Sequence, residues 1–175
     1  MRVYLFLEGD ELFMELERKI LKLYEKDATL NHQQMAIMLG VDEKTVTDTI
    51  ARLEKEGVIL GYNAIINWEK WGDDGVTAMI DVKVVPEREV GFDSIAERVS
   101  RYPEVRCVYL MSGTYDLSVV VQGETMKDVA RFVAEKLATL EHVQSTTSHF
   151  VLKRYKQDNF LFNDKEEDRR LVVSP

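Results

Sequence analysis

The sequence has little of several features that would each define a class of protein. Among its 175 residues there is one cysteine, Cys107, so the chain cannot form an internal disulfide or a metal site built from several cysteines. No apolar run approaches the roughly 18 residues that a membrane-spanning helix needs. The N-terminal stretch RVYLFLEGD is too short for a secretory signal, and acidic residues follow it at once. With 45% apolar and 31% charged residues, the composition is that of a globular protein, which we expect in the cytoplasm without a membrane partner.

Positive charge is also scarce. Lysine and arginine number 23 against 31 aspartates and glutamates, which gives a net charge of −8. Residues 1–72 hold 9 basic and 13 acidic side chains, and residues 73–154 hold 10 and 13, so neither half is cationic. Because nucleic-acid-binding proteins usually present a basic surface, this balance argues against such a partner. A DNA-binding element therefore has to be identified from its pattern.

Three helices are predicted in the first part of the chain. Apolar residues recur at helical spacing over residues 11–26, 31–39 and 42–56, and Asn31 is a suitable cap for the second helix. Gly40 supplies the positive φ that a tight turn before the third helix requires. This order of elements predicts a helix-turn-helix. Its expected core comprises Met35, Ala36, Leu39, Val41, Val46 and Ile50.

The third helix is the candidate DNA-reading element. In a helix-turn-helix the N-terminal part of this helix enters the major groove, where its polar side chains meet base edges. Neighbouring polar groups are better placed for phosphates. The alternative is a three-helix module for protein docking or dimerisation, because residues 43–56 hold three bases against four acids. The base-contact candidates are Lys44, Thr45, Thr47 and Asp48, and the phosphate candidates are His32, Gln33 and Arg52.

An extended segment and a linker follow the third helix. Residues 57–67 predict a strand that forms the wing of a winged helix-turn-helix domain spanning residues 11–67. Residues 68–75, WEKWGDDG, contain glycines and acids without a sustained period. We place the domain boundary in this linker.

The second half of the chain changes period and predicts a domain over residues 76–155. Strands are expected at residues 76–85, 105–112, 115–122 and 143–155, and helices at residues 88–101 and 125–140. This order is that of the ferredoxin-like βαββαβ unit, an antiparallel sheet with two helices on one face. The chain is thus predicted to be α+β, and residues 156–175 form a polar surface arm. The second helix is expected to bury Met126, Val129, Ala130, Val133, Leu137 and Leu140.

The predicted strands are apolar on both faces. In residues 76–85, for example, Ile80 and Val82 point to one face and Met79 to the other. In the next strand, Tyr109 likewise lies on the face opposite to its apolar neighbours. Because the helices cover one face, a second copy of the chain is expected to cover the other and form a homodimer. The alternative is that the C-terminal residues fold over that face.

Residues 111–118, MSGTYDLS, form a second informative stretch. Gly113 lets a backbone N–H approach a ligand, and Asp116 lies just beyond it beside Tyr115. A carboxylate close to free amides and to the hydroxyls of residues 146–148 suits the two ends of an amino-acid zwitterion. From the residues alone, an ordinary hairpin turn in which Asp116 caps its own backbone is the simpler interpretation.

Residues 14–155 resemble the Lrp/AsnC family of feast/famine transcription regulators. The similar stretches are ILKLYEKDATLNHQQMAIMLGVDEKTVTDTIARLEKEGVILGYNAIIN, with RLEKEGVILGY as its most specific part, then LMSGTYDLSVVVQG and HFVLKRYK. The resemblance implies a winged helix-turn-helix on double-stranded operator DNA and a ferredoxin-like domain that assembles dimers into larger homo-oligomers. It also implies a small-molecule effector, an amino acid. The effector-binding candidates are Met111, Gly113, Tyr115, Asp116, Thr146, Thr147 and Ser148.

The sequence departs from the family in the middle of the third helix. Family members commonly carry arginines where this chain has Thr47, Asp48 and Thr49, whereas Arg52 is retained. We expect weaker DNA binding or an unusual base preference, since an acid can accept a hydrogen bond from cytosine N4 but repels phosphate. The resemblance begins near residue 14, and one interpretation of residues 1–13 is a strand paired across the dimer.

Three functions from different classes can be compared. The leading hypothesis is a sequence-specific DNA-binding regulator modulated by a small metabolite, and the second is a metabolite-sensing oligomer without DNA binding. The third is an enzyme, because certain haem-precursor decarboxylases share this two-domain layout. However, His32, His142 and His149 are scattered, and the sequence has no catalytic triad, glycine-rich phosphate loop or metal-ligand spacing. We therefore expect no enzymatic activity, no cofactor and no metal.

Overall fold

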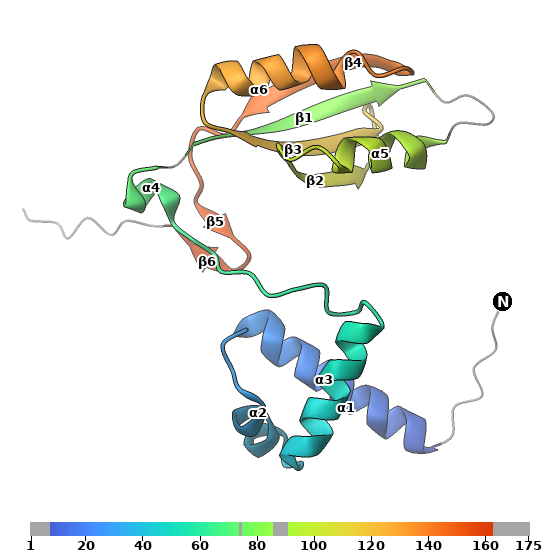
Figure 1. The fold of residues 1–175 in the computed structure, drawn as a ribbon, viewed down its shortest axis with the longest axis vertical. Coiled ribbons are helices and arrows are strands. Elements are labelled where there is room, and N and C mark those ends of the chain that lie inside the picture. The colour runs from blue at the N-terminus through green and yellow to red at the C-terminus, as the bar shows by residue number, and fades with distance from the viewer. Residues whose placement is uncertain (1–7, 74, 86–90, 163–175) are drawn as a thin grey trace, which may run out of the picture. The chain divides into compact units, whose positions relative to one another are not determined.

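The computed structural model describes residues 8–73, 75–85 and 91–162 (Figure 1). The chain divides into two compact units, Met1–Ala64 and Ile65–Pro175, and each has its own hydrophobic core. Within the described ranges, no helix is both long enough and apolar enough to cross a membrane.

Three helices build the first unit: α1 (Glu8–Lys26), α2 (His32–Leu39) and α3 (Glu43–Lys55). Because α1 already begins at Glu8, residues 8–13 are helical, and the strand suggested for residues 1–13 is wrong over that part. Residues 1–7 lie outside the described ranges.

The helix-turn-helix forms as predicted. Asn31 caps α2 reciprocally with Gln34, since each side chain accepts a hydrogen bond from the backbone N–H of the other. Gly40 ends α2 with φ at 69°, a conformation that a residue with a side chain rarely adopts. The buried core consists of Ile20, Met35, Ala36, Val46 and Ile50, with Leu39 and Val41 packed against it.

The segment after α3 differs from expectation. Residues 57–67, predicted as the wing strand, make no sheet hydrogen bonds within the described part of the chain. Tyr62 instead holds this segment to the helices: its hydroxyl donates to the Glu54 carboxylate at 2.9 Å, and its ring meets Tyr24 edge-on at 5.1 Å. A strand requires a pairing partner, and the described residues supply none here.

The predicted linker contains a short helix, α4 (Trp68–Trp71). The Asn67 side chain caps it by accepting the Lys70 N–H at 3.0 Å, and Gly72 ends it at φ 89°. Asn67 and Gly72 are residue types that typically begin and end a helix. The helix is too short for a helical period to reveal it.

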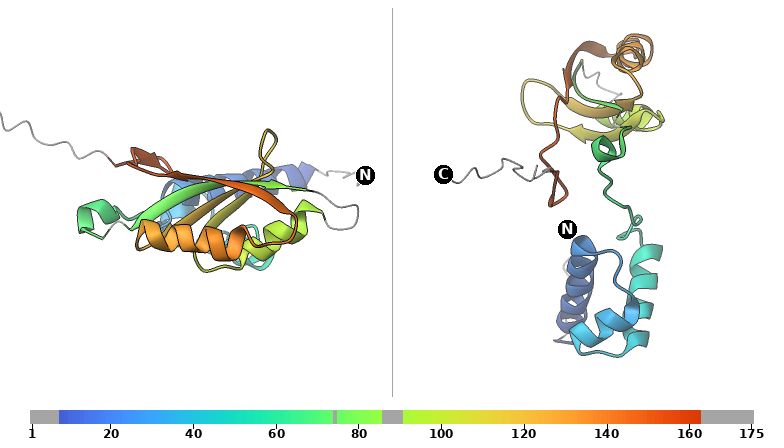
Figure 2. Two further views of the ribbon diagram at one scale, coloured as in Figure 1. Left: turned by 90° about the horizontal axis from the view of Figure 1, so that it is seen from above. Right: turned by 90° about the vertical axis from the view of Figure 1, so that its left-hand side faces the viewer.

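The second unit is a four-stranded antiparallel sheet in the order β2-β3-β1-β4. Both of its main helices lie on the same side of the sheet (Figure 2, left). The predicted ferredoxin-like α+β fold is confirmed, while residues 86–90, including the first residues of the predicted helix 88–101, lie outside the described ranges. The strands are β1 (Val76–Val84), β2 (Val105–Leu110), β3 (Leu117–Gly123) and β4 (Val143–Phe150), and the helices are α5 (Phe92–Ser100) and α6 (Met126–Phe132).

The helix predicted over residues 125–140 is interrupted by a π-helical turn. After α6 the chain continues through Val133–Leu137, where the Ala138 N–H donates to the first carbonyl of that turn at 2.8 Å. A π turn holds one residue more than an α turn and shifts the face that later side chains present. Phe132 is buried in the core, whereas Met126 and Ala130, both predicted as core residues, are exposed.

The uncovered face of the sheet carries its apolar side chains mainly on β2 and β3 and its charged side chains on β1 and β4. Residues that pair directly across strands share a face, so the strand register assigns each side chain to one side. The uncovered face carries Cys107, Tyr109 and Val120 on β2 and β3, Met79 at the centre, and Asp81, Lys83, Thr147 and His149 on β1 and β4. The prediction of two apolar faces is therefore wrong for the half that adjoins β4.

The predicted last strand, residues 143–155, ends early at Phe150. The chain then forms a hairpin of β5 (Lys156–Gln157) and β6 (Phe160–Leu161). Phe162 is buried, with the Arg154 guanidinium 5.4 Å from its ring centroid. The beginning of the expected polar arm is thus a hairpin, and residues 163–175 lie outside the described ranges.

Candidate functional site

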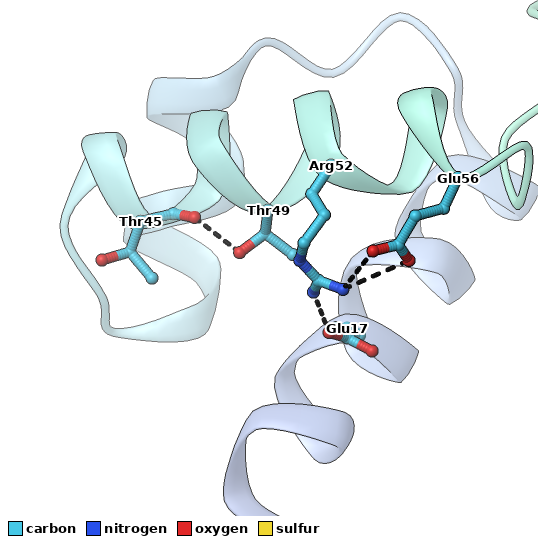
Figure 3. Close-up of polar contacts among 5 residues, drawn as sticks. All are labelled: Glu17, Thr45, Thr49, Arg52 and Glu56. Atoms are coloured by element: carbon cyan, nitrogen blue, oxygen red, sulfur yellow. Dashed lines mark hydrogen bonds and ion pairs between the residues drawn. The ribbon is translucent and has the colours of Figure 1, made fainter. Parts of the chain in front are cut away.

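Two threonine hydroxyls of α3 are engaged within the helix-turn-helix. The Asp42 carboxylate accepts two hydrogen bonds from Thr45, one from its hydroxyl at 2.5 Å and one from its backbone N–H at 2.8 Å. These hydrogen bonds lower the pKa of Asp42. The buried Thr49 hydroxyl donates to the Thr45 carbonyl at 2.7 Å (Figure 3). Asp42 and Thr45 thereby fix the start of α3, and the predicted base contact Thr45 has its hydroxyl committed to that role.

His32 and Thr47 connect the two helices of the motif. The His32 Nδ1 lies 2.9 Å from the Thr47 hydroxyl oxygen, which itself donates to the Glu43 carbonyl at 2.9 Å. Because a hydroxyl has a single hydrogen, His32 Nδ1 is the donor in their contact when the Thr47 hydroxyl donates to Glu43. The structure therefore brings together a predicted phosphate contact and a predicted base contact, and it uses them to fix α2 against α3.

Arg52 lies between two carboxylates of its own unit. Its guanidinium forms an ion pair with Glu17 of α1 and lies 3.3 Å from the Glu56 carboxylate at the end of α3 (Figure 3). The Phe13 ring centroid is 5.3 Å from its central carbon. The hydrogen bond to Glu17 raises the pKa of Arg52. The charge predicted to meet phosphate is thus compensated inside the fold.

Three of the predicted DNA contacts are free on the surface. Gln33, Lys44 and Asp48 are exposed, and within the described residues none of their side chains has a hydrogen bond or an ion pair. The spacing of four places Lys44 and Asp48 on one face of α3. This face is the part of the candidate interface that is available to a ligand.

The hairpin between β2 and β3 is held to β1 through Asp116. The Asp116 carboxylate accepts the Val84 N–H at 2.9 Å and lies 3.2 Å from the Lys83 ammonium. The hydrogen bond from Val84, together with Lys83, lowers the pKa of Asp116. The pairing of β1 with β3 ends at Val82 and Leu117, so the Val84 N–H beyond it is free for this contact. Asp116 therefore caps the backbone of β1 rather than that of its own hairpin.

The other effector candidates divide between the two faces of the sheet. The Tyr115 hydroxyl lies 3.0 Å from the Thr147 hydroxyl, while Gly113, at φ 150°, is exposed at the tip of the loop, as is Met111. Thr146 and Ser148 pair with Val82 and Ile80, so they lie on the helix side of the sheet, away from Thr147. Thr146 and Ser148 are therefore excluded from a common site with the other candidates, which can form one surface on the uncovered face of the sheet.

A second side-chain contact on this face was missed by the sequence reasoning. His149 Nε2 lies 3.3 Å from the Asp81 carboxylate, whose side chain is 30% exposed. Asp81 pairs directly with Thr147, so it adjoins the Tyr115 contact. Strict alternation along residues 76–85 would have placed Asp81 on the open face, but the partner strand could not be aligned from sequence. Among the described residues, no group of three or more His, Cys, Asp or Glu side chains could hold a metal ion.

Comparisons with known proteins agree with both units. The family model of the Lrp/AsnC ligand binding domain matches residues 77–161, and a winged helix-turn-helix DNA-binding model matches residues 15–59. The uncharacterized HTH-type transcriptional regulator YugG of Bacillus subtilis (strain 168) is 52% identical over 162 residues, which cover 92% of this chain and 98% of YugG.

Solved structures show the same fold. AsnC of E. coli matches with a TM-score of 0.64 at 21% identity, covering 88% of this chain and 97% of AsnC. The transcriptional regulator NMB0573 of Neisseria meningitidis, in a complex with L-Met, matches with a TM-score of 0.66 at 23% identity, covering 82% and 92% of the two chains. The two units therefore define an HTH-type transcriptional regulator with a ligand-binding domain. The chain belongs to the Lrp/AsnC family.

The Arg52–Glu17 contact should stabilise the helix-turn-helix. In a double-mutant cycle with Arg52→Met and Glu17→Gln, we expect a coupling free energy of about 1 kcal/mol, because the Glu17 side chain is only 20% exposed. The matched control is Glu15→Gln with Lys19→Met, a pair whose side chains are 59% and 56% exposed. Its coupling should stay below about 0.5 kcal/mol. Urea unfolding measures both cycles, and equal couplings would contradict the bridging role.

Asp116 should make stability depend on pH. Its folded pKa is lowered, so its contribution is present above the unfolded pKa of about 3.9 and is lost as the pH falls through the folded pKa. Asp116→Asn, which removes the charge beside Lys83, should lower the free energy of unfolding by roughly 1 kcal/mol at pH 7. The difference from the wild type should shrink below about pH 4. Glu97→Gln on α5 is the control, and a pH-independent deficit in Asp116→Asn would contradict this account.

Proposed function

We propose that this regulator binds a two-fold symmetric operator as a homodimer, and that an amino acid bound beside residues 111–116 modulates this binding. One observation carries the proposal. The chain joins a helix-turn-helix, whose α3 presents free polar groups, to a ligand-binding domain whose loop collects polar groups on an open face. A metabolite-sensing oligomer without DNA binding is the alternative that the first experiment below distinguishes.

On the DNA side, Lys44 is the candidate reader of a guanine. Its ammonium is free and lies in the first turn of α3, the part of such a helix that meets base edges. Gln33, at the start of α2, is placed for a phosphate. His32, Thr45, Thr47 and Arg52 support this surface by fixing α3 against its neighbours.

On the effector side, we assign contact and positioning to different residues. The exposed loop at Met111 and Gly113, with the Tyr115 and Thr147 hydroxyls, supplies groups for an amino-acid carboxylate, and the partly exposed Asp81 carboxylate can accept an ammonium. Asp116 is a positioning residue, because both of its oxygens already bind β1. The L-Met complex of the Neisseria meningitidis regulator supports an amino acid as the ligand class.

The homodimer is inferred from the open face of the sheet. Met79 and Tyr109 are 47% and 53% exposed there in a single chain, and a second copy would cover them. We also infer that such dimers associate into larger homo-oligomers. We also infer binding rather than catalysis, since His32 and His149 lie in different units and each contacts a structural neighbour. A regulator of chromosomal DNA would act in the cytoplasm.

The DNA proposal predicts selective binding by the full-length protein. Selection from random duplexes should return a two-fold symmetric site, bound at least about 1,000-fold more tightly than a scrambled duplex at low salt. Lys44→Gln should weaken binding to the selected site by roughly tenfold, as expected for loss of one charged base contact. Fluorescence anisotropy measures both affinities.

Lys127→Gln is the matched control for the DNA experiment. Lys127 is an exposed lysine at the start of α6, outside the helix-turn-helix. Its replacement makes the same change in net charge and should leave operator affinity unchanged. Failure to select any sequence would exclude the DNA-binding function and favour the metabolite-sensing alternative.

The effector proposal predicts that at least one amino acid stabilises the protein. A ligand that binds only the folded state raises the melting temperature with concentration. In Tyr115→Phe, the affinity for the amino acid with the largest effect should fall about tenfold, because the hydroxyl contact is lost. Tyr155→Phe, at an exposed tyrosine after β4, should keep full affinity. If no amino acid shifts the melting temperature, the effector class is wrong.

A further inference from the structure

The polar groups of α3 divide into those that the fold uses and those that it leaves free. The hydroxyls of Thr45, Thr47 and Thr49 are bonded to Asp42, the Glu43 carbonyl and the Thr45 carbonyl. None of the three hydroxyls therefore has a hydrogen left to donate to a base without breaking a contact that holds the helix.

Glu43, Lys44 and Asp48 carry the remaining polar side chains in the first half of α3, and Lys44 and Asp48 share one face of the helix. They lie four residues apart, a spacing that allows an ion pair, yet the described side chains form none here. Four residues rise about 6 Å along a helix, so the two side chains can address neighbouring or next-neighbouring base pairs. Both oxygens of the Asp48 carboxylate are thus available to a partner.

The chemistry of a carboxylate restricts which base that partner can be. An ionised carboxylate only accepts hydrogen bonds, and guanine N7 and O6 and thymine O4 are acceptors too. Adenine presents a donor beside the N7 acceptor, whereas the major-groove edge of cytosine presents the N4 donor without an adjacent acceptor. Cytosine is therefore the base that satisfies Asp48 best.

We propose that Asp48 is a specificity-determining residue that selects cytosine at one position of each operator half-site. This inference rests on the proposed DNA-binding function. Asp48 lowers affinity for every duplex by repelling phosphates, and it lowers affinity most for duplexes that lack a donor at its position. The nearby cation Arg52 does not offset that repulsion, because Glu17 and Glu56 compensate its charge.

The test compares the wild type with Asp48→Asn and Asp48→Ala in selection from random duplexes. The wild type should prefer cytosine at one half-site position by roughly 10- to 100-fold. Asp48→Asn should move that preference to adenine, since an amide pairs with adenine N6 and N7. Asp48→Ala should lose the preference there while its affinity for scrambled duplex rises several-fold. Asp48 is exposed and unpaired within the described residues, so both variants should keep the wild-type melting temperature.

Glu97→Gln on α5 is the control for net charge. It removes one negative charge from the other unit and should leave both the base preference and the affinity for scrambled duplex as in the wild type. If the wild type and Asp48→Ala select the same base at every position, the role of Asp48 is wrong while the DNA-binding function stands. If the wild type shows no sequence preference, the DNA-binding function and this inference both fail.

Discussion

The three-helix unit has a small core, and this limits which of its polar side chains are free to bind DNA. That core has five buried residues, Ile20, Met35, Ala36, Val46 and Ile50, and other contacts add to it in holding α3. Polar side chains supply them, through the Asp42 cap, the His32–Thr47 hydrogen bond and the Arg52–Glu17 ion pair. A hydrogen or charge used in this way is not available to DNA, so recognition depends mainly on the polar groups that the fold leaves free.

A related constraint acts in the ligand-binding domain. The pairing of β1 with β3 ends before Val84, and Asp116 of the neighbouring hairpin accepts the Val84 N–H that the sheet leaves unpaired. The carboxylate therefore sets the position of the loop that carries Gly113 and Tyr115. A residue that is prominent in a ligand-binding motif can act by holding the loop, and a change at such a residue alters ligand affinity without a lost contact.

Features with a local cause could be predicted from the sequence. Helical and strand periods gave the ferredoxin-like order, and Asn31 and Gly40 were identified from their own chemistry. Contacts between distant residues could not be predicted: Glu17 and Arg52 are 35 positions apart, and the sequence between them carries no signal of their pairing. Thr146 and Ser148 are an intermediate case. Side chains alternate between the two faces of a strand, so the sequence already separates these two residues from Thr147, although all three carry hydroxyls.

The acidic composition bears on how such a protein can discriminate among DNA sequences. Non-specific binding depends on cations that neutralise phosphates, and residues 1–72 carry 9 basic against 13 acidic side chains. Weak non-specific binding does not weaken specificity, because specificity is the ratio between the affinities for correct and incorrect sites. A second copy that places another α3 on the same operator raises the affinity for a two-part site without added positive charge. An acidic regulator of this family can therefore combine low affinity per unit with selective binding, provided that it binds as an assembly.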